Sequence, residues 1–184
     1  ASGSYTTAIG YNTQASGNHA IAMGYSSQAS AGQSTAMGYF TKASGENSTA
    51  IGYHTEASGR SSTTMGLFTK ANAYGMVAIG RYNAVVESSS SYLWQTNDPL
   101  FVIGNGSSDQ NTSNAMTVLK SGRVGLQSET SPSYALQLPN STAVGTGRAQ
   151  ANLWSTYSDT RVKSNQQPIQ YGLAEVMRMV PKTY

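Results

Sequence analysis

The sequence has no cysteine, few charged side chains and no long apolar run. Without cysteine, neither disulfide bonds nor thiolate metal sites can form. Charged residues make up 10% of the 184 residues and the formal net charge is +3, so no basic stripe could follow a phosphate backbone. No run of about 18 apolar residues is present to cross a membrane. We therefore expect neither a nucleic-acid partner nor membrane insertion.

Residues suited to bind a metal or a cofactor are also missing. His19 and His54 lie far apart in the sequence and have no carboxylate at ligand spacing, so we expect both at the surface. Gly104-x-Gly106 and Gly145-x-Gly147 lack the third glycine of a dinucleotide fingerprint. We expect no metal and no cofactor.

The sequence does contain one short motif that is repeated six times. The copies begin at Ala8, Ala22, Ala36, Ala50, Thr64 and Ala78, so the period is fourteen without slippage. The third position of every copy is glycine: Gly10, Gly24, Gly38, Gly52, Gly66 and Gly80. A fixed period of this kind indicates stacked structural repeats.

Fourteen residues are too few for a helix pair, which needs about 33 or more per repeat. They suit one coil of a β-solenoid with two short strands and two turns. Thr7 to Tyr11 alternates larger and small residues, as a strand does. Gly17, Gly45 and Gly59 recur in Ala-Ser-Gly, where we expect turns that use positive φ. The sequence predicts an all-β fold.

The residue before each repeat glycine is Ile or Met, and this row is the candidate assembly surface. Alanine recurs at a second point of each coil, so we expect a coil too narrow to hold large side chains. The row then points outward and meets partner chains, most simply identical ones in cyclic symmetry. Its members are Ile9, Met23, Met37, Ile51, Met65 and Ile79. The alternative is that the row fills the interior of a monomeric solenoid.

The tyrosines that follow the repeat glycines form a second row, at Tyr11, Tyr25, Tyr39 and Tyr53. Aromatic side chains offer contact area and a polar tip, so this row is either an adhesive surface or a stabilising stack between coils. We favour the stack.

The repeat Ser48-Thr49-Ala50-Ile51-Gly52-Tyr53 resembles the head repeat of YadA-like trimeric autotransporter adhesins. The resemblance implies a left-handed parallel β-roll, three chains around one axis, and a fibre on the bacterial cell surface. It names no receptor.

We expect three segments along the chain: head repeats over 1–87, a β-rich neck or shaft over 88–153, and a C-terminal segment over 154–184. Copies five and six are eroded, as terminal repeats of solenoids are. Residues 100–103 read as a strand, and residues 115–119 and 123–126 as a hairpin around Lys120-Ser121-Gly122. Residues 114–125 resemble shaft segments of phage tail fibres and bacterial fibre proteins. The chain opens on the end of a repeat, so we expect a fragment of a longer protein.

The C-terminal segment contains the candidate chemistry. Residues 157–165 resemble the opening motif of the intramolecular chaperone domain of phage tailspikes and endosialidases, with every motif position kept: Ser158, Asp159, Arg161, Lys163 and Asn165. The resemblance implies trimerisation and then self-cleavage of the Tyr157–Ser158 bond, with Ser158 as nucleophile, Lys163 as its base and the other three in support. A lysine of lowered pKa is a recognised base for serine.

The family's domain continues beyond the residues present here, so we expect cleavage as a property of the complete precursor. The alternative role for Arg161 and Lys163 is a solvated basic strand. Residues 169–177 place apolar side chains at helical spacing, which predicts a short helix before Pro181.

Three functions fit these patterns. The first is a homotrimeric surface fibre that binds a cell-surface glycan, protein receptor or matrix protein. The second is a single-turnover self-cleaving peptidase that acts on no external substrate. The third is a spacer in a phage tail fibre or bacterial filament, located on the virion or the cell surface. We favour the adhesive fibre, with self-cleavage belonging to the precursor.

Overall fold

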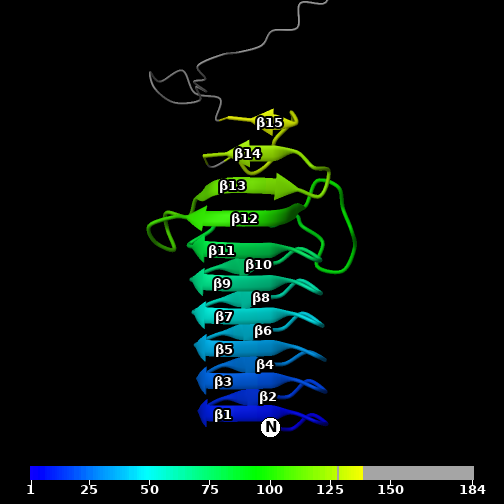
Figure 1. The fold of residues 1–184 in the computed structure, drawn as a ribbon, viewed down its shortest axis with the longest axis vertical. Helices are drawn as coiled ribbons and strands as arrows, with labels where there is room; N and C mark the ends of the chain where they lie inside the picture. Colours follow the sequence, from blue (N-terminus) through cyan, green and yellow to red (C-terminus); the bar gives the residue numbers. More distant parts are fainter. Residues whose placement is uncertain (128, 139–184) are drawn as a thin grey trace, which may run out of the picture. The chain divides into compact units, whose positions relative to one another are not determined.

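The computed structural model describes residues 1–127 and 129–138, and within them every regular element is a strand (Figure 1). The first sheet has ten strands: β1 (Thr7–Tyr11), β3 (Ile21–Tyr25), β5 (Thr35–Tyr39), β7 (Thr49–Tyr53), β9 (Thr63–Leu67), β11 (Val77–Arg81), β12 (Pro99–Asn105), β13 (Asn114–Leu119), β14 (Val124–Leu126) and β15 (Leu136–Gln137). The second has five: β2 (Gln14–Ala15), β4 (Gln28–Ala29), β6 (Lys42–Ala43), β8 (Glu56–Ala57) and β10 (Lys70–Ala71).

Each of the first five sequence repeats forms one coil, with a long strand in the first sheet and a short strand in the second, and the sixth contributes only the long strand β11. Neighbouring coils pair in parallel and in the register of the sequence repeat, so Ala8 lies opposite Ala22 and Ala22 opposite Ala36. The short strands pair in the same way, Ala15 with Ala29. The predicted all-β solenoid with two strands per coil is confirmed.

The space between the two sheets is filled almost entirely by alanine, serine and threonine. Ala22, Ala36 and Ala50 point inward from the first sheet, and Ala15, Ala29, Ala43 and Ala57 from the second; all are fully buried. Thr41 donates a hydrogen bond from Oγ1 to Ser27 Oγ (2.9 Å) inside the coil. The prediction of a coil too narrow for large side chains is confirmed for the first coils, whereas Met76 and Val102 are fully buried in the last ones.

The prediction that the Ala-Ser-Gly glycines adopt positive φ is wrong. Gly17, Gly45 and Gly59 are absent from the positive-φ residues, which in this turn are instead His19 (φ 58°) and Asn47 (φ 57°). The glycines are needed for space, because a Cβ at Gly17 would overlap the carbonyl oxygen of Ala31 in the next coil.

Positive φ occurs at the glycine of the long strand, in every one of the six repeats. Gly52 has φ 127°, and its added Cβ would overlap the carbonyl oxygen of Gly66. Both backbone conformation and close approach therefore require glycine at this point of the coil.

The solenoid does not end with the sixth repeat, although the sequence was expected to lose its period there. Strand β12 pairs in parallel with β11, with Ala78 opposite Val102 and Gly80 opposite Gly104. These partners lie further apart in the sequence than one period, because an additional segment is inserted in this coil. The expected boundary at 87/88 stays a prediction, but the first sheet continues across it.

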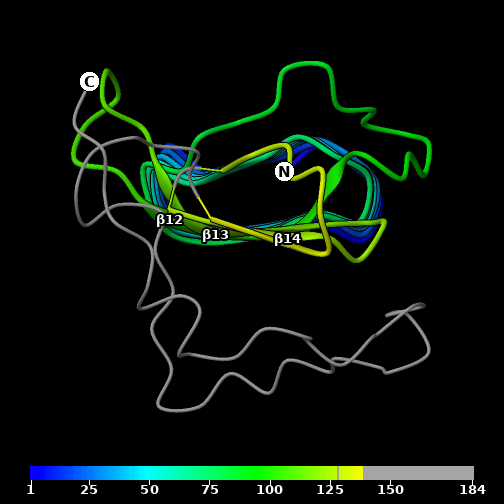
Figure 2. The same cartoon turned by 90° about the horizontal axis from the view of Figure 1, so that it is seen from above.

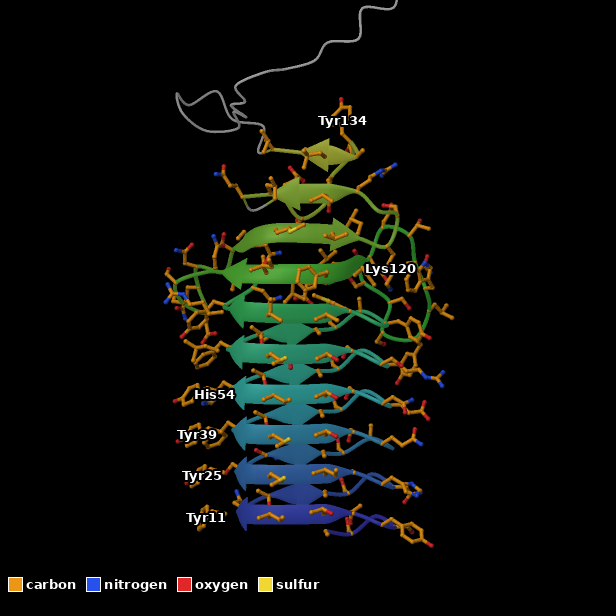
Figure 3. The ribbon with its side chains drawn as sticks, in the orientation of Figure 1. Tyr11, Tyr25, Tyr39, His54, Lys120 and Tyr134 are labelled. Carbon is orange, nitrogen blue, oxygen red and sulfur yellow. The ribbon has the colours of Figure 1, made fainter. Side chains whose placement is uncertain are left out.

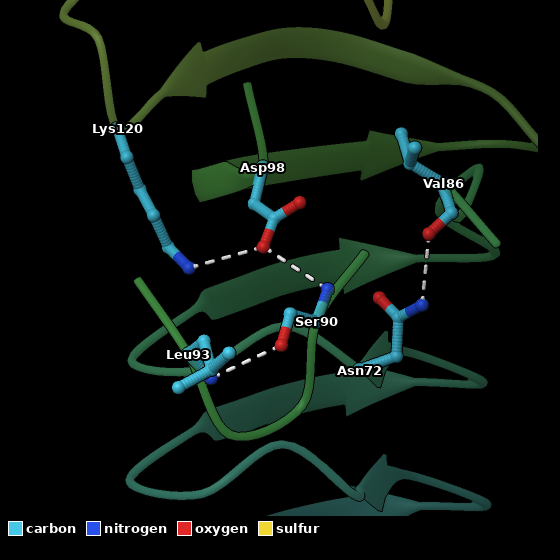
Figure 4. Close-up of polar contacts among 6 residues, drawn as sticks. All are labelled: Asn72, Val86, Ser90, Leu93, Asp98 and Lys120. Carbon is cyan, nitrogen blue, oxygen red and sulfur yellow. Dashed lines mark hydrogen bonds and ion pairs between the residues drawn. The ribbon is translucent and has the colours of Figure 1, made fainter. Parts of the chain in front are cut away.

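The inserted loop, residues 84–98, packs back along the turns of the preceding coils. The amide of Tyr74 donates to the carbonyl of Ser90 (2.8 Å), and the amide of Arg60 to that of Ser91 (2.9 Å). Asn72 Nδ2 donates to the carbonyl of Val86 (2.9 Å), as Figure 4 shows. Seen from above, the loop lies outside the outline of the stacked coils, on the side away from β12, β13 and β14 (Figure 2).

A buried ion pair fixes the end of this loop. Lys120 Nζ lies 3.4 Å from Asp98 Oδ2, and the two side chains are 0% and 8% exposed (Figure 4). The same carboxylate oxygen accepts a hydrogen bond from the amide of Ser90 (3.1 Å). The ammonium also lies over the ring of Trp94, 5.1 Å from its centroid.

The predicted strand at 100–103 and the predicted hairpin are confirmed as β12, β13 and β14. β13 pairs antiparallel with β12 and with β14, and Gly122 in the tight turn has φ 83°. This reversal of direction interrupts the parallel stack. The expected helix over 169–177 lies outside the described residues.

Candidate assembly surface

The Ile/Met row lies on the outer face of the first sheet, outside the coil. Side chains alternate along each strand, so with the alanine at position 8 or 22 pointing inward, the next residue must point outward. Ile9 is 55% exposed and Met65 48%, and the other four members are half-buried against one another. The alternative, in which this row fills the interior, is therefore wrong. That the row forms a trimer interface stays a prediction.

A second outward row runs parallel to it, two residues earlier in each strand. Its members are Thr7, Ile21, Thr35, Thr49, Thr63 and Val77, which pair in register from coil to coil. Neither row contains a charged residue. Figure 3 shows that side chains of successive coils form columns along the stack.

Apart from Arg81, the last residue of β11, the charged side chains of the repeats lie on the other sheet and in the turns. Lys42 and Glu56 form an exposed ion pair on the second sheet (3.3 Å), and Arg60 pairs with Glu46 in the turns (3.2 Å). One sheet thus presents an uncharged surface and the other a solvated one. An uncharged, half-apolar face along a whole sheet is the kind of surface that associates.

The tyrosine row forms a stack, as favoured from the sequence. The ring centroids of Tyr11 and Tyr25 are 5.0 Å apart, those of Tyr25 and Tyr39 5.0 Å, and those of Tyr39 and Tyr53 4.8 Å. In each pair the ring planes lie within 16° of parallel. In Figure 3, Tyr11, Tyr25 and Tyr39 lie one above the next at the ends of the strands. Because the ring faces cover one another, the row presents mainly edges and hydroxyl groups to solvent.

A second aromatic ladder, at the residue after the tyrosine position, was missed in the sequence. Phe40, His54, Phe68 and Tyr82 stack with centroids 4.9, 4.6 and 4.8 Å apart. All four have positive φ, between 42° and 51°. Their spacing by exactly one repeat period was the available signal. His54 is therefore part of a ring stack, and His19 stacks on Tyr5 at 5.2 Å.

Comparison with known families supports the resemblance of the first coils to YadA-like heads. Residues 1–27 and 29–55 each match the family model of the YadA head domain repeat. These segments are similar to YadA heads. No curated protein matches the chain. The resemblance seen in the sequence is thereby confirmed for this part of the chain, whereas the resemblances of the shaft and of the chaperone motif stay predictions.

A groove of about 570 Å³ lies beside the second aromatic ladder, and most of the residues that line it follow the matched segments. Its walls include Phe40, His54 and Phe68 together with side chains of both charges, among them Lys70 and Asp109. The charges are mixed and exposed, and no group of three or more His, Asp or Glu in residues 1–127 and 129–138 is placed to hold a metal ion. Nor does the described part contain a helix able to cross a membrane.

The predicted catalytic residues, Ser158 and Lys163, and their supporting residues Asp159, Arg161 and Asn165 lie outside the described residues. Their arrangement, and cleavage of the Tyr157–Ser158 bond, stay predictions.

Proposed function

We propose that this chain is the head and neck of a homotrimeric adhesin-like fibre on the bacterial cell surface. The observation that carries the proposal is the uncharged Ile/Met row on the outer face of the first sheet, whose first four members lie in segments that match YadA head repeats. YadA-type heads are homotrimeric adhesins exposed at the surface of bacteria. If three copies pack with these rows against one another, all three rows are removed from water.

The physical argument for association is the contrast between the two faces. The interior of the first coils holds only small side chains, and of the larger apolar groups of the repeats only Met76 is fully buried, so most of them remain outside the coil. Burial of apolar surface stabilises by about 25 cal/mol per Å². A row that repeats in every coil therefore adds a similar increment of association per coil, whatever the length of the fibre.

Mass measurement of the chain by light scattering, at micromolar concentration and after dilution, tests this proposal. We expect the mass of three chains, each of 19.4 kDa. Ile51→Lys places a charge in the row and should lower the mass to that of a monomer while circular dichroism still reports strands. Gln28→Lys is the matched control, because Lys42 and Lys70 occupy the same position of later coils. A wild-type chain that is monomeric at all concentrations would refute the trimer.

We further propose that the trimer binds a glycan, a protein receptor or a matrix protein on another cell. A stacked array offers many equivalent shallow contacts, which favours avidity over one deep pocket. Binding of the labelled trimer to cells and to immobilised matrix proteins should be strong, and it should fall when the Ile51→Lys monomer is used. A trimer that binds neither would instead favour the second candidate, a spacer in a filament or a phage tail fibre.

The second candidate is favoured by the motif at residues 158–165. If a complete chaperone domain follows, the precursor trimerises and Ser158 then cleaves the chain after Tyr157, with Lys163 as base. This proposal rests on the sequence motif alone. It is compatible with either a cell-surface or a virion location.

A further inference from the structure

The assembly surface extends beyond the repeats, into a segment that the family match does not cover. The pairing of β12 with β11 extends both outward rows beyond the repeats. Ile103 lies opposite Ile79, and Phe101 lies opposite Val77. The residue between them, Val102, points inward and is fully buried. The alternation of the repeats is therefore preserved across the inserted loop.

The antiparallel strands continue the same two rows. In β13, Met116 lies opposite Ile103 and Val118 opposite Phe101, while the intervening Thr117 is fully buried. Directly opposed residues of paired strands lie on the same face of the sheet. The rows continue at Leu126 and Val124 of β14, and then at Leu136 of β15, which is 62% exposed.

The composition of the surface changes at this point. Through the repeats the second row is mostly threonine, so each coil offers one large apolar side chain. From Val77 upward both rows are apolar, and they contain the bulkier Phe101. No charged residue interrupts either row between Thr7 and Leu136. Strands β11, β12, β13 and β14 thus present two apolar side chains each in these rows, whereas most strands of the repeats present one.

No described residue covers this wider apolar surface. The inserted loop lies on the opposite side of the coils, where Ser90 and Ser91 accept hydrogen bonds from Tyr74 and Arg60 (Figure 2). The rows run in line with the Ile/Met row of the repeats, because the two register shifts of the β12–β13 pair lie on either side of Phe101–Ile103. A surface that continues the assembly surface in line and with the same chemistry fits the same occupant.

We infer that β12–β15 form a second, more strongly associating part of the trimer interface, covered by the corresponding strands of other copies of this chain. The inference rests on the proposed homotrimer. Each strand of the neck then contributes more to the free energy of association than each strand of the repeats. The neck would then set the register of the three chains.

Cysteine substitutions in the full chain test this inference directly, because the natural chain has none. Met116→Cys tests the neck, Met37→Cys tests the repeats, and Gln28→Cys on the second sheet is the control. Around a three-fold axis a residue near the axis meets its own copies, so a short bis-maleimide should link Met116→Cys chains covalently and leave Gln28→Cys chains single. Failure of Met116→Cys to cross-link, with Met37→Cys linking well, would overturn the inference and leave the trimer intact.

A second measurement compares Val118→Lys with Ile51→Lys by light scattering across a dilution series. We expect Val118→Lys to raise the concentration at which the trimer dissociates by at least about a hundredfold, since an unpaired charge would be buried between chains. We expect that effect to exceed the effect of Ile51→Lys. If Val118→Lys leaves the dilution curve unchanged while Ile51→Lys shifts it, the neck surface is covered by something else, such as residues 139–184 of the same chain. If the wild-type chain is itself monomeric, the proposed function fails first.

Discussion

Replacement of Gly52 by alanine should unfold the middle of the solenoid. Gly52 has φ 127°, a conformation that costs a residue with a Cβ about 1–3 kcal/mol. The new Cβ would also overlap the carbonyl oxygen of Gly66 and lie 3.0 Å from the Gly66 amide nitrogen. These are backbone atoms of a paired strand, so the overlap can be relieved only by separating β7 from β9. Loss of two or three ladder hydrogen bonds adds about 0.5–1.5 kcal/mol each, so we expect a total loss of about 2–7 kcal/mol.

Gly75→Ala is the matched control for this prediction. Gly75 has φ 64°, but no atom lies within 4 Å of its added Cβ. Alanine there should cost only the left-handed backbone, about 1–2 kcal/mol. Gly75→Asn should lie within about 1 kcal/mol of wild type, because Asn47 occupies the equivalent turn with φ 57°.

The assay is denaturant unfolding followed by far-UV circular dichroism, at one fixed protein concentration because association contributes to stability. Equal losses for Gly52→Ala and Gly75→Ala would show that backbone conformation alone explains the glycine row. The argument from close approach of neighbouring coils would then be refuted.

Further predictions concern the aromatic ladder, the buried ion pair and the C-terminal motif. Tyr39→Ala removes two stacked contacts of 5.0 and 4.8 Å and should lower the free energy of unfolding by about 2–4 kcal/mol, whereas Tyr39→Phe keeps the ring and should change it by less than about 0.5 kcal/mol. Asp98→Asn leaves the ammonium of Lys120 buried without its counter-charge and should cost about 3–5 kcal/mol; addition of Lys120→Met should restore much of the loss, and no restoration would contradict the ion-pair argument. In a chain extended by a complete chaperone domain, mass spectrometry should detect a product that ends at Tyr157, and Ser158→Ala should abolish it; a product that persists would exclude Ser158 as the nucleophile.

The coil and the direction of its side chains could be predicted from the sequence because the repeat leaves few alternatives. The unvarying period fixes the length of the coil, and alanine at Ala15 and Ala29 limits its width. Once the interior is limited to small residues, alternation along the strand sends Met23 and Met37 outward. Each step follows from volume and strand geometry, with no need for contacts between distant segments.

What could not be predicted depended on atoms of the neighbouring coil. From the sequence, Gly17 was expected to be needed for a positive φ. The position instead requires glycine because a Cβ there would overlap the carbonyl oxygen of Ala31, one full coil away. Phe40 and His54 were missed as a ladder because the same position holds Asn12 and Ser26 in earlier coils.

The seventh coil was missed for a different reason, which concerns chain length. The segment Phe101-Val102-Ile103-Gly104 keeps the Ile–Gly pair of a repeat after two apolar residues, with valine in place of alanine, but the inserted segment displaces it from the period. A search that allows one insertion between copies would have found Ile103-Gly104. Loops at the surface tolerate such insertions because they cost little closure entropy. Loss of a sequence period therefore does not imply that the sheet ends.

The narrow core finally implies that association contributes to the stability of the fold. A buried alanine methyl group provides about 0.8 kcal/mol, far less than the larger apolar residues that remain outside the coil. Inside the coil, the hydroxyl groups of Ser48, Thr55, Ser62 and Thr69 are buried without a hydrogen-bond partner among the described residues, and each such group costs about 1–3 kcal/mol. The repeats therefore gain little from their own interior, and the outward rows must supply much of the remainder when they are buried between chains. We expect the thermal midpoint to rise with protein concentration, and Ile51→Lys to lower it and to remove this dependence. A midpoint that is the same over a hundredfold range of concentration, in a trimer that dissociates within that range, would show that each coil stack is stable alone.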